Sequence, residues 1–139
     1  MNAPLYTVEI LRLAASLPEP LTLERVDGSD EARSPTCGSV VHTEVSLDNE
    51  GRVEAVSQQV HACAFGQASA ALVAGQAAGR NREEVERALA AMSEWLKGGD
   101  ELPDWPGVGA LVPARARKSR HGAILLPFRA LLAAMSKPR

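Results

Sequence analysis

The sequence predicts an α+β fold, in which a small antiparallel sheet of about three strands has helices packed on one of its faces. The first observation is that residues 39–47 and 52–60 alternate between apolar and polar side chains on either side of a turn, which is typical of a β-hairpin. The second is that four other stretches repeat apolar or small residues at helical spacing. A sheet this small must bury one face against helices to be stable, and the two patterns together therefore predict this fold.

Length and composition indicate one ordinary domain spanning residues 1–139. A chain of 139 residues is long enough to bury one core. No run approaches the roughly 20 apolar residues of a membrane span, and the N-terminus lacks the pattern of a signal peptide. Two cysteines in a chain of this length do not make a disulfide framework. We therefore expect a cytoplasmic, reducing location and no membrane association.

The charges are unevenly distributed. Residues 113–139 hold seven of the 15 basic residues and none of the 17 acidic ones. This split indicates either a docking surface for an acidic partner or a solvated loop and tail. Nucleic acid is an unsuitable partner, because the net charge is −2 and no aromatic residues lie within the basic run to stack on bases.

The first part of the chain predicts a helix followed by extended segments. Residues 5–16 form one amphipathic pattern, which prolines at 18 and 20 stop. A strand is expected around 22–26, followed by a turn at 27–30. An extended segment then leads into Cys37, because the residue before a proline avoids helix.

The hairpin brings the two cysteines together. Its turn centres between residues 49 and 50, so positions whose numbers add up to about 99–100 face each other. Cys37 is then opposite residue 62 or 63. We therefore expect Cys37 and Cys63 at the same end of the hairpin, within reach of one ion or cluster.

Three helices are expected after the hairpin. The first follows Cys63 and consists mostly of small residues. The second is opened by Asn81 as the N-cap of a capping box and ends at a Gly-Gly pair. A proline-rich connection over 100–120 then leads to the last helix. That helix should begin near 123–126, because Pro127 is tolerated only in a first turn, and His121 should therefore precede it. Buried anchors are expected in the connection at Trp105 and Leu111.

Cys63 lies where the second hairpin strand ends and the small-residue helix begins. At such a junction, unpaired N–H groups and the positive end of the helix dipole favour the thiolate, which is the form that binds metal or attacks sulfur. Free cysteine is also among the most buried residue types, so Cys63 has a second interpretation as a small core residue.

Three motifs carry a resemblance to a known family. They are P-T-C-G-S at 35–39, D-N-E-G-R-V at 48–53 and H-A-C-A-F-G-Q-A-S-A-A-L at 61–72, with a looser match in R-H-G-A-I-L-L-P-F-R-A-L at 120–131. In their order and spacing the chain resembles the IscU/NifU/SufU family of iron–sulfur cluster assembly scaffolds, over roughly residues 5–135. In the final helix and its proline-rich approach it is most similar to the SufU-like branch. The resemblance implies a single NifU N-terminal/IscU-like domain.

The resemblance also implies a ligand set, which this chain keeps only in part. The family assembles a [2Fe–2S] cluster on three cysteines, helped by an aspartate two residues after the first. Cys37 and Cys63 match the first two cysteines. Ser39 stands at the aspartate position, and a hydroxyl is a far poorer ligand than a carboxylate.

The third cysteine of the family falls on Ala123 or on Gly122, according to the alignment of the last helix, and neither residue can ligate. His121 is near that position under both alignments, and it is the only nearby replacement. An equally good interpretation is that His121 is a solvated residue of a basic loop. His61 and His42 are expected to be outward-facing strand residues.

Three functions fit these residues. The first is a scaffold or carrier that accepts iron and sulfur at Cys37 and Cys63, docks a cysteine desulfurase through 113–120 and supplies apo-protein clients. The second is a sulfur acceptor that stimulates a desulfurase and binds zinc through Cys37, Cys63 and His121. The third is a degenerate paralogue that acts as an interaction module. A cluster usually needs four donors, and a second subunit in a homo-oligomer would complete the set. No paired carboxylates, nucleophile–base pair or cofactor loop indicates an enzyme.

Overall fold

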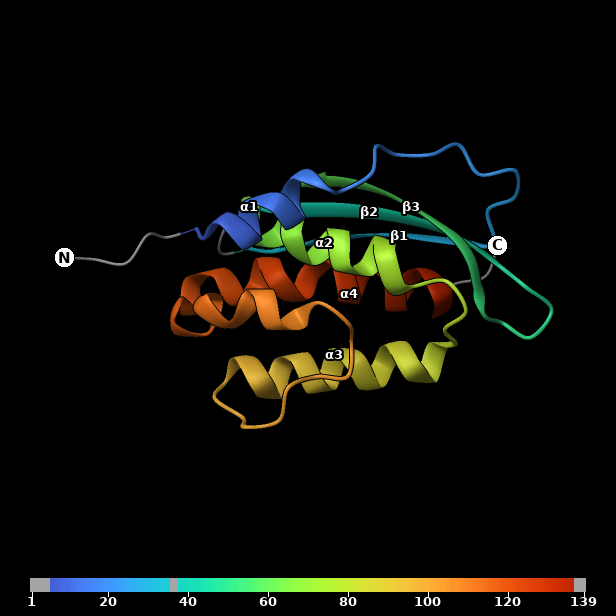
Figure 1. Cartoon of the computed structure of the whole chain (residues 1–139). Helices are drawn as coiled ribbons and strands as arrows, with labels where there is room; N and C mark the ends of the chain where they lie inside the picture. The colour runs from blue at the N-terminus through green and yellow to red at the C-terminus, as the bar shows by residue number, and fades with distance from the viewer. Residues whose placement is uncertain (1–5, 36–37, 137–139) are drawn as a thin grey trace.

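A computed structural model describes residues 6–35 and 38–136 of the chain, and Cys37 lies outside these ranges. The predicted α+β fold with a three-stranded antiparallel sheet is confirmed (Figure 1). The elements in chain order are α1 (Val8–Ala15), β1 (Gly28–Arg33), β2 (Val40–Leu47), β3 (Val53–His61), α2 (Ala64–Gln76), α3 (Arg82–Leu96), the 3₁₀ helices η1 (Val108–Ala116) and η2 (Lys118–Arg120), and α4 (His121–Ser136).

The helices cover one face of the sheet, as predicted. The strand order is β1-β2-β3; α4 lies against β1 and β2, and α2 lies against β3. Two further helices pack on these: α1 packs on α2, and α3 packs on α4 on the side away from the sheet (Figure 1). Side chains in β2 alternate accordingly, with Val41, Thr43 and Val45 fully buried beneath the helices. None of the helices in the described ranges has the length and apolar character that crossing a bilayer requires.

The β2–β3 register places Cys63 just beyond the end of the hairpin at which β2 begins. Val40 pairs with His61, which is one residue beyond the predicted register, because a bulge between Ser46 and Leu47 adds a residue on the β3 side. Extending the register by two residues sets position 38 opposite position 63. The end of β3 that leads into α2 therefore adjoins the loop between β1 and β2.

The first strand begins later than predicted. The expected strand at 22–26 and the expected turn at 27–30 are both wrong, since β1 starts at Gly28. The reason is the pairing of Asp27 with β2: its amide donates to the Val45 carbonyl at 2.8 Å, and its carboxylate accepts from the Leu47 amide at 2.7 Å. These bonds hold a turn-like sequence in extended form. Its charged residues are tolerated because β1 is an edge strand.

The predicted helices α1, α2 and α3 are present. The capping box is confirmed, with the Asn81 side chain accepting from the Glu84 amide at 2.9 Å and the Glu84 carboxylate accepting from the Asn81 amide at 3.1 Å. Trp105 and Leu111 are buried anchors as predicted, and the Trp105 indole N–H donates to the Leu72 carbonyl at 2.9 Å.

The last helix begins earlier than predicted. It starts at His121, so His121 is its first residue and Pro127 lies in its interior. Proline has no N–H for the carbonyl four residues before it, which is that of Ala123. The hydroxyl of Ser69 in α2 donates to the next carbonyl, that of Ile124, at 2.5 Å. The proline thus lies inside the helix, close to a carbonyl that is bonded to α2, although local propensity would place it in the first turn.

Candidate functional site

Cys63 is the N-cap residue of α2 and the described thiol of the candidate site. Its backbone is extended, with φ −66° and ψ 174°, and its side chain makes no capping hydrogen bond. The thiol is not in a disulfide; it is half-buried and packs against the edge of the main core. Cys63 is therefore not a sealed core residue, and it is a partly exposed residue at the positive end of a helix.

A glycine in the first turn of α2 lies where α4 meets the Cys63 end of the helix. A Cβ added at Gly66 would lie 2.6 Å from the Cβ of Ala62 and 3.4 Å from both the Cβ and the carbonyl oxygen of Ala123. Ala123 is fully buried at this contact. The position that aligns with a third cysteine therefore lies against the first turn of the helix that Cys63 caps.

The place of Gly66 between Ala62 and Ala123 is not evident from the sequence, in which it is one of many small residues. A signal was present, because a glycine inside a helix is unfavourable and indicates a close approach of another backbone. The partner of that approach was not readable, since Ala123 is more than fifty residues away in the chain.

His121 is held by the backbone of the preceding 3₁₀ segment. Its Nε2 lies 3.0 Å from the Ala114 carbonyl oxygen and 3.1 Å from that of Arg115. Carbonyl oxygens only accept, so Nε2 carries a proton and donates, which leaves the lone pair of a neutral ring on Nδ1. A metal-binding histidine commonly donates its other nitrogen to a backbone carbonyl in this way. The same bonds also serve a purely structural purpose, because they join η1 to the start of α4.

The other candidate residues lie as follows. Ser39 is buried immediately before β2, where its carbonyl accepts from the Ser34 amide at 2.9 Å. His61 is exposed at the end of β3, and His42 lies on the open face of the sheet with Nε2 3.9 Å from a Glu44 carboxylate oxygen. Residues 6–35 and 38–136 contain no group of three or more His, Cys, Asp or Glu side chains placed to hold a metal. Because Cys37 lies outside these ranges, its part in a ligand set stays a prediction.

The basic segment predicted as a docking surface divides into two parts. Arg115 is committed to packing: its Nε donates to the Trp95 carbonyl at 3.0 Å, its Nη2 to the Gly99 carbonyl at 2.7 Å, and its guanidinium lies 5.1 Å from the centre of the Trp95 ring. Lys118 is exposed, while Arg117 and Arg120 are partly exposed; none of the three forms an ion pair with a described residue. These three cations immediately precede α4.

Comparisons with known proteins were made at the level of sequence and of structure. No protein-family model matches the sequence, and a comparison with curated proteins also found no match. The structure is similar to that of a NifU-like protein (N-terminal) from Brucella abortus, with a TM-score of 0.85 and 29% identity over 95% of this chain and 92% of that one. It is also similar to a protein assigned as an iron–sulfur cluster assembly scaffold of the SUF system from Fervidobacterium islandicum AW-1, with a TM-score of 0.81 and 20% identity over 94% and 96% of the two chains. The resemblance inferred from the motifs is thus confirmed.

Proposed function

Because the chain shares the NifU/SufU-like fold over nearly its whole length, we propose that it is a scaffold or carrier for iron–sulfur cluster assembly that accepts iron and sulfur at Cys37 and Cys63. The observation that carries the proposal is the half-exposed Cys63 thiol at the N-cap of α2, which has no internal hydrogen bond to compete with a ligand. Thiolate is the characteristic ligand of iron–sulfur clusters. The cluster is cargo, bound transiently and passed to apo-protein clients.

Sulfur would arrive by transfer from a persulfide on a cysteine desulfurase. The Cys63 thiolate attacks the terminal sulfur of that persulfide, a new S–S bond forms on Cys63, and the old S–S bond breaks to release the donor as a thiolate. No net oxidation or reduction occurs. The exposed cations before α4 would attract an acidic surface of the desulfurase, and Arg115 would not take part, because it is bound to the carbonyls of Trp95 and Gly99.

The ligand count defines how the cluster would be completed. Cys37, Cys63 and Nδ1 of His121 supply three donors, whereas a cluster usually takes four. A second subunit or the partner protein would provide the remainder, so we expect a cluster-loaded homo-oligomer or a cluster that is labile in the isolated chain.

Anaerobic reconstitution with ferrous iron and sulfide tests this function. We expect thiolate-to-iron absorption bands that are lost in Cys37→Ala and in Cys63→Ala. His42→Ala is the matched control, because His42 lies on the open face of the sheet, and it should reconstitute like the wild type. If the wild type developed no bands under any anaerobic condition, the scaffold function would be refuted.

Zinc binding is the second candidate function, and the contacts of His121 favour it. Two thiolates and an imidazole whose Nε2 is fixed by carbonyls form a three-ligand set suited to zinc. The protein would then accept sulfur and stimulate a desulfurase without holding a cluster. Metal analysis of protein purified without added metal distinguishes the two functions, since stoichiometric zinc supports this one and iron supports the first. A third outcome is that Cys37→Ala and Cys63→Ala leave partner binding and cellular activity unchanged, which would support an interaction module.

A gain-of-ligand variant tests the placement of the missing third cysteine. Ala123→Cys would put a thiol against the first turn of α2, beside the helix end that Cys63 caps. We expect a reconstituted cluster that survives longer in this variant than in the wild type. Gly122→Cys is the matched comparison from the alternative alignment, and a longer lifetime in that variant alone would move the third position by one residue.

A further inference from the structure

A groove of about 550 Å³ runs between α3 and the segment 99–104 that follows it. Its floor is apolar and includes Ala88, Ala91 and the deeply buried Trp95. Leu102 stands on its rim with 53% of its surface exposed. The volume falls within the roughly 300–1,000 Å³ that is typical of ligand-binding pockets. None of the residues assigned to iron and sulfur lines this groove.

The groove is rich in carboxylates without partners. Two arginines also line it, but Arg80 is committed, since its guanidinium lies 4.0 Å from the centre of the Trp105 ring and its Nε donates to the Gln76 carbonyl. Glu84 is likewise committed, to Arg52 at 3.0 Å. Arg87 then remains as the one uncommitted cation among the lining residues. The lining carboxylates that make no hydrogen bond or ion pair with another described residue are Glu94, Asp100, Glu101 and Asp104.

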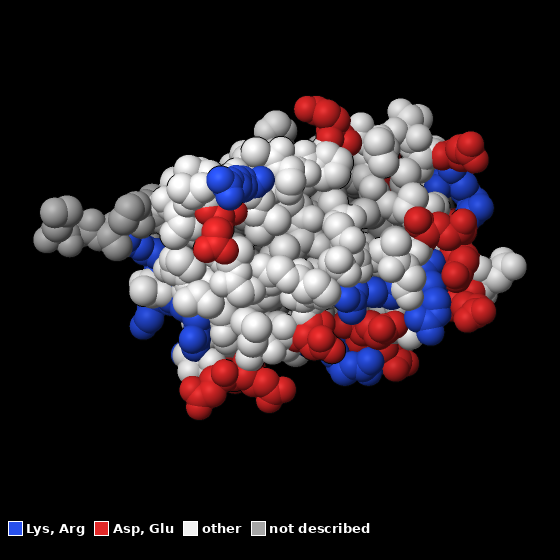
Figure 2. Space-filling model, viewed as in Figure 1, with Lys and Arg blue, Asp and Glu red and all other residues white. Residues whose placement is uncertain are grey.

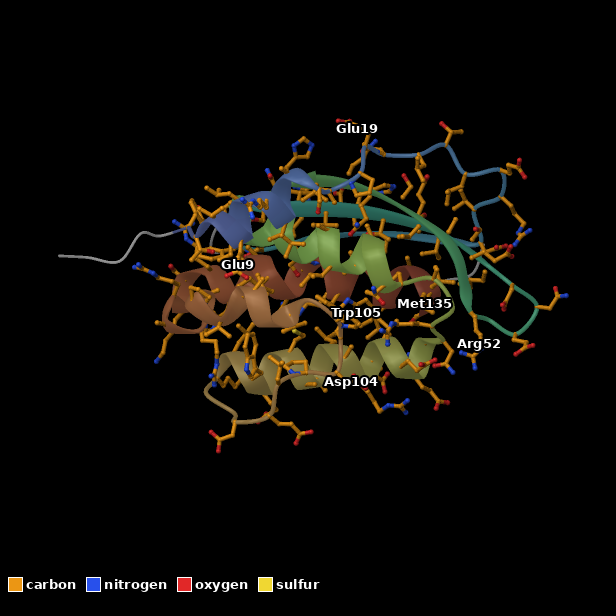
Figure 3. All side chains as sticks on the ribbon, viewed as in Figure 1. Glu9, Glu19, Arg52, Asp104, Trp105 and Met135 are labelled. Atoms are coloured by element: carbon orange, nitrogen blue, oxygen red, sulfur yellow. The ribbon has the colours of Figure 1, made fainter. Side chains whose placement is uncertain are left out.

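The carboxylates are spread along the groove. The α3 wall from Glu84 to Glu94 is about 15 Å long, because each helical residue rises 1.5 Å. Glu94 lies in the last turns of α3. Asp104 adjoins Trp105, and the guanidinium of Arg80, the residue just before the N-cap of α3, lies over the Trp105 ring (Figure 3). In Figure 2, acidic side chains lie along the lower face, over α3 and the loop after it, with basic side chains among them toward the start of α3. A single small cation cannot meet charges distributed over this length. An extended peptide of about five residues can, at roughly 3.3 Å per residue.

We propose that this groove binds an extended basic segment of a partner protein, with a cationic side chain toward each end and an apolar side chain on the floor beside Leu102. Four unpartnered carboxylates against one uncommitted arginine supply the charge complementarity, and the apolar floor supplies surface to bury. The binding is independent of the cysteines.

The probe is a fluorescein-labelled peptide with the sequence Arg-Ala-Leu-Ala-Arg, and binding to the metal-free full chain is followed by fluorescence anisotropy at low ionic strength. We expect binding that weakens as salt is added, and none to the acidic counterpart Glu-Ala-Leu-Ala-Glu. If the wild type did not bind the basic peptide, or bound both peptides equally, the proposal would be overturned.

Two charge-matched double variants locate the binding. The double variant Glu94→Gln with Asp104→Asn should lower the affinity for the basic peptide about fivefold, a modest factor because exposed ion pairs are individually weak. Glu9→Gln with Glu19→Gln removes the same charge from α1 and the segment after it, away from the groove (Figure 3), and should change affinity less than about twofold. Equal weakening by both variants would reduce the effect to net charge and overturn the proposal. Self-association of the wild type that is lost only in the first variant would make a second copy the occupant, and would also overturn it.

Discussion

Gly66→Ala tests how tightly the first turn of α2 packs against Ala62, the residue before Cys63. The new methyl would lie 2.6 Å from the Cβ of Ala62, and real Cβ atoms essentially never come within 3.0 Å of another heavy atom of this kind. Neither methyl can rotate away, because each is fixed to its backbone, so the start of α2 or the residue before Cys63 must move. Overpacking of this kind costs about 1–3 kcal/mol. Replacing a helical glycine by alanine returns about 1 kcal/mol, which leaves a net destabilisation of about 1 kcal/mol.

Gly75→Ala in the same helix is the matched control. A Cβ at Gly75 meets nothing within 4 Å, so the propensity gain is unopposed and the free energy of unfolding should rise by about 0.5–1 kcal/mol. Chemical denaturation of both variants measures the two free energies. At about 3–4 °C per kcal/mol for a chain of this size, thermal unfolding should show Tm moving in opposite directions.

The double variant Gly66→Ala with Ala62→Gly separates steric crowding from other causes. Removing the Ala62 methyl relieves the shortest contact, and we expect it to recover most of the crowding penalty. If Gly66→Ala alone stabilised the protein as much as Gly75→Ala does, then the Ala62 methyl would not crowd position 66, and the predicted steric penalty would be refuted.

Three further predictions concern the supports of the fold. Asn81→Ala should lower the free energy of unfolding by about 1 kcal/mol in a denaturation experiment, because the α3 amide at Glu84 loses its cap. The backbone hydrogen bond from Asn81, followed by the contact with Arg52, lowers the pKa of Glu84. A carboxylate whose pKa is lower in the folded than in the unfolded protein stabilises the fold at pH values above the ordinary glutamate pKa of about 4.3. This stabilisation is lost as the pH falls through the pKa of the folded state. The Tm of Glu84→Gln should therefore lie below that of the wild type at neutral pH and converge with it in acid; a constant gap would contradict the assignment. Trp105→Phe should cost roughly 1–2 kcal/mol of unfolding free energy, because the buried indole N–H that bonds to Leu72 is lost, and an unchanged denaturation midpoint would refute this.

Much of the fold was predictable because it depends on neighbours in the chain. The alternation in residues 39–60 defines the hairpin, and the capping box at Asn81 is complete within four residues. The prediction failed where a local signal met a distant partner. The residues around Asp27 resemble a turn, but bonds to β2 hold them extended, and those bonds cross about twenty residues.

The candidate site was predictable in its residue types and in its end of the hairpin, but less so in its contacts. The sequence by itself determined that Cys63 caps a helix of small residues, and it predicts that the hairpin directs the Cys37 segment toward that end. Only the tertiary structure decided that Arg115 packs on Trp95 instead of facing solvent, that Ser69 bonds to the Ile124 carbonyl of α4, and that Gly66 lies against Ala123. The physical reason is the distance along the chain over which each effect acts. Periodicity and capping act over a few residues, whereas the partner of a carbonyl, a ring or a missing side chain depends on which surfaces meet after the chain has folded.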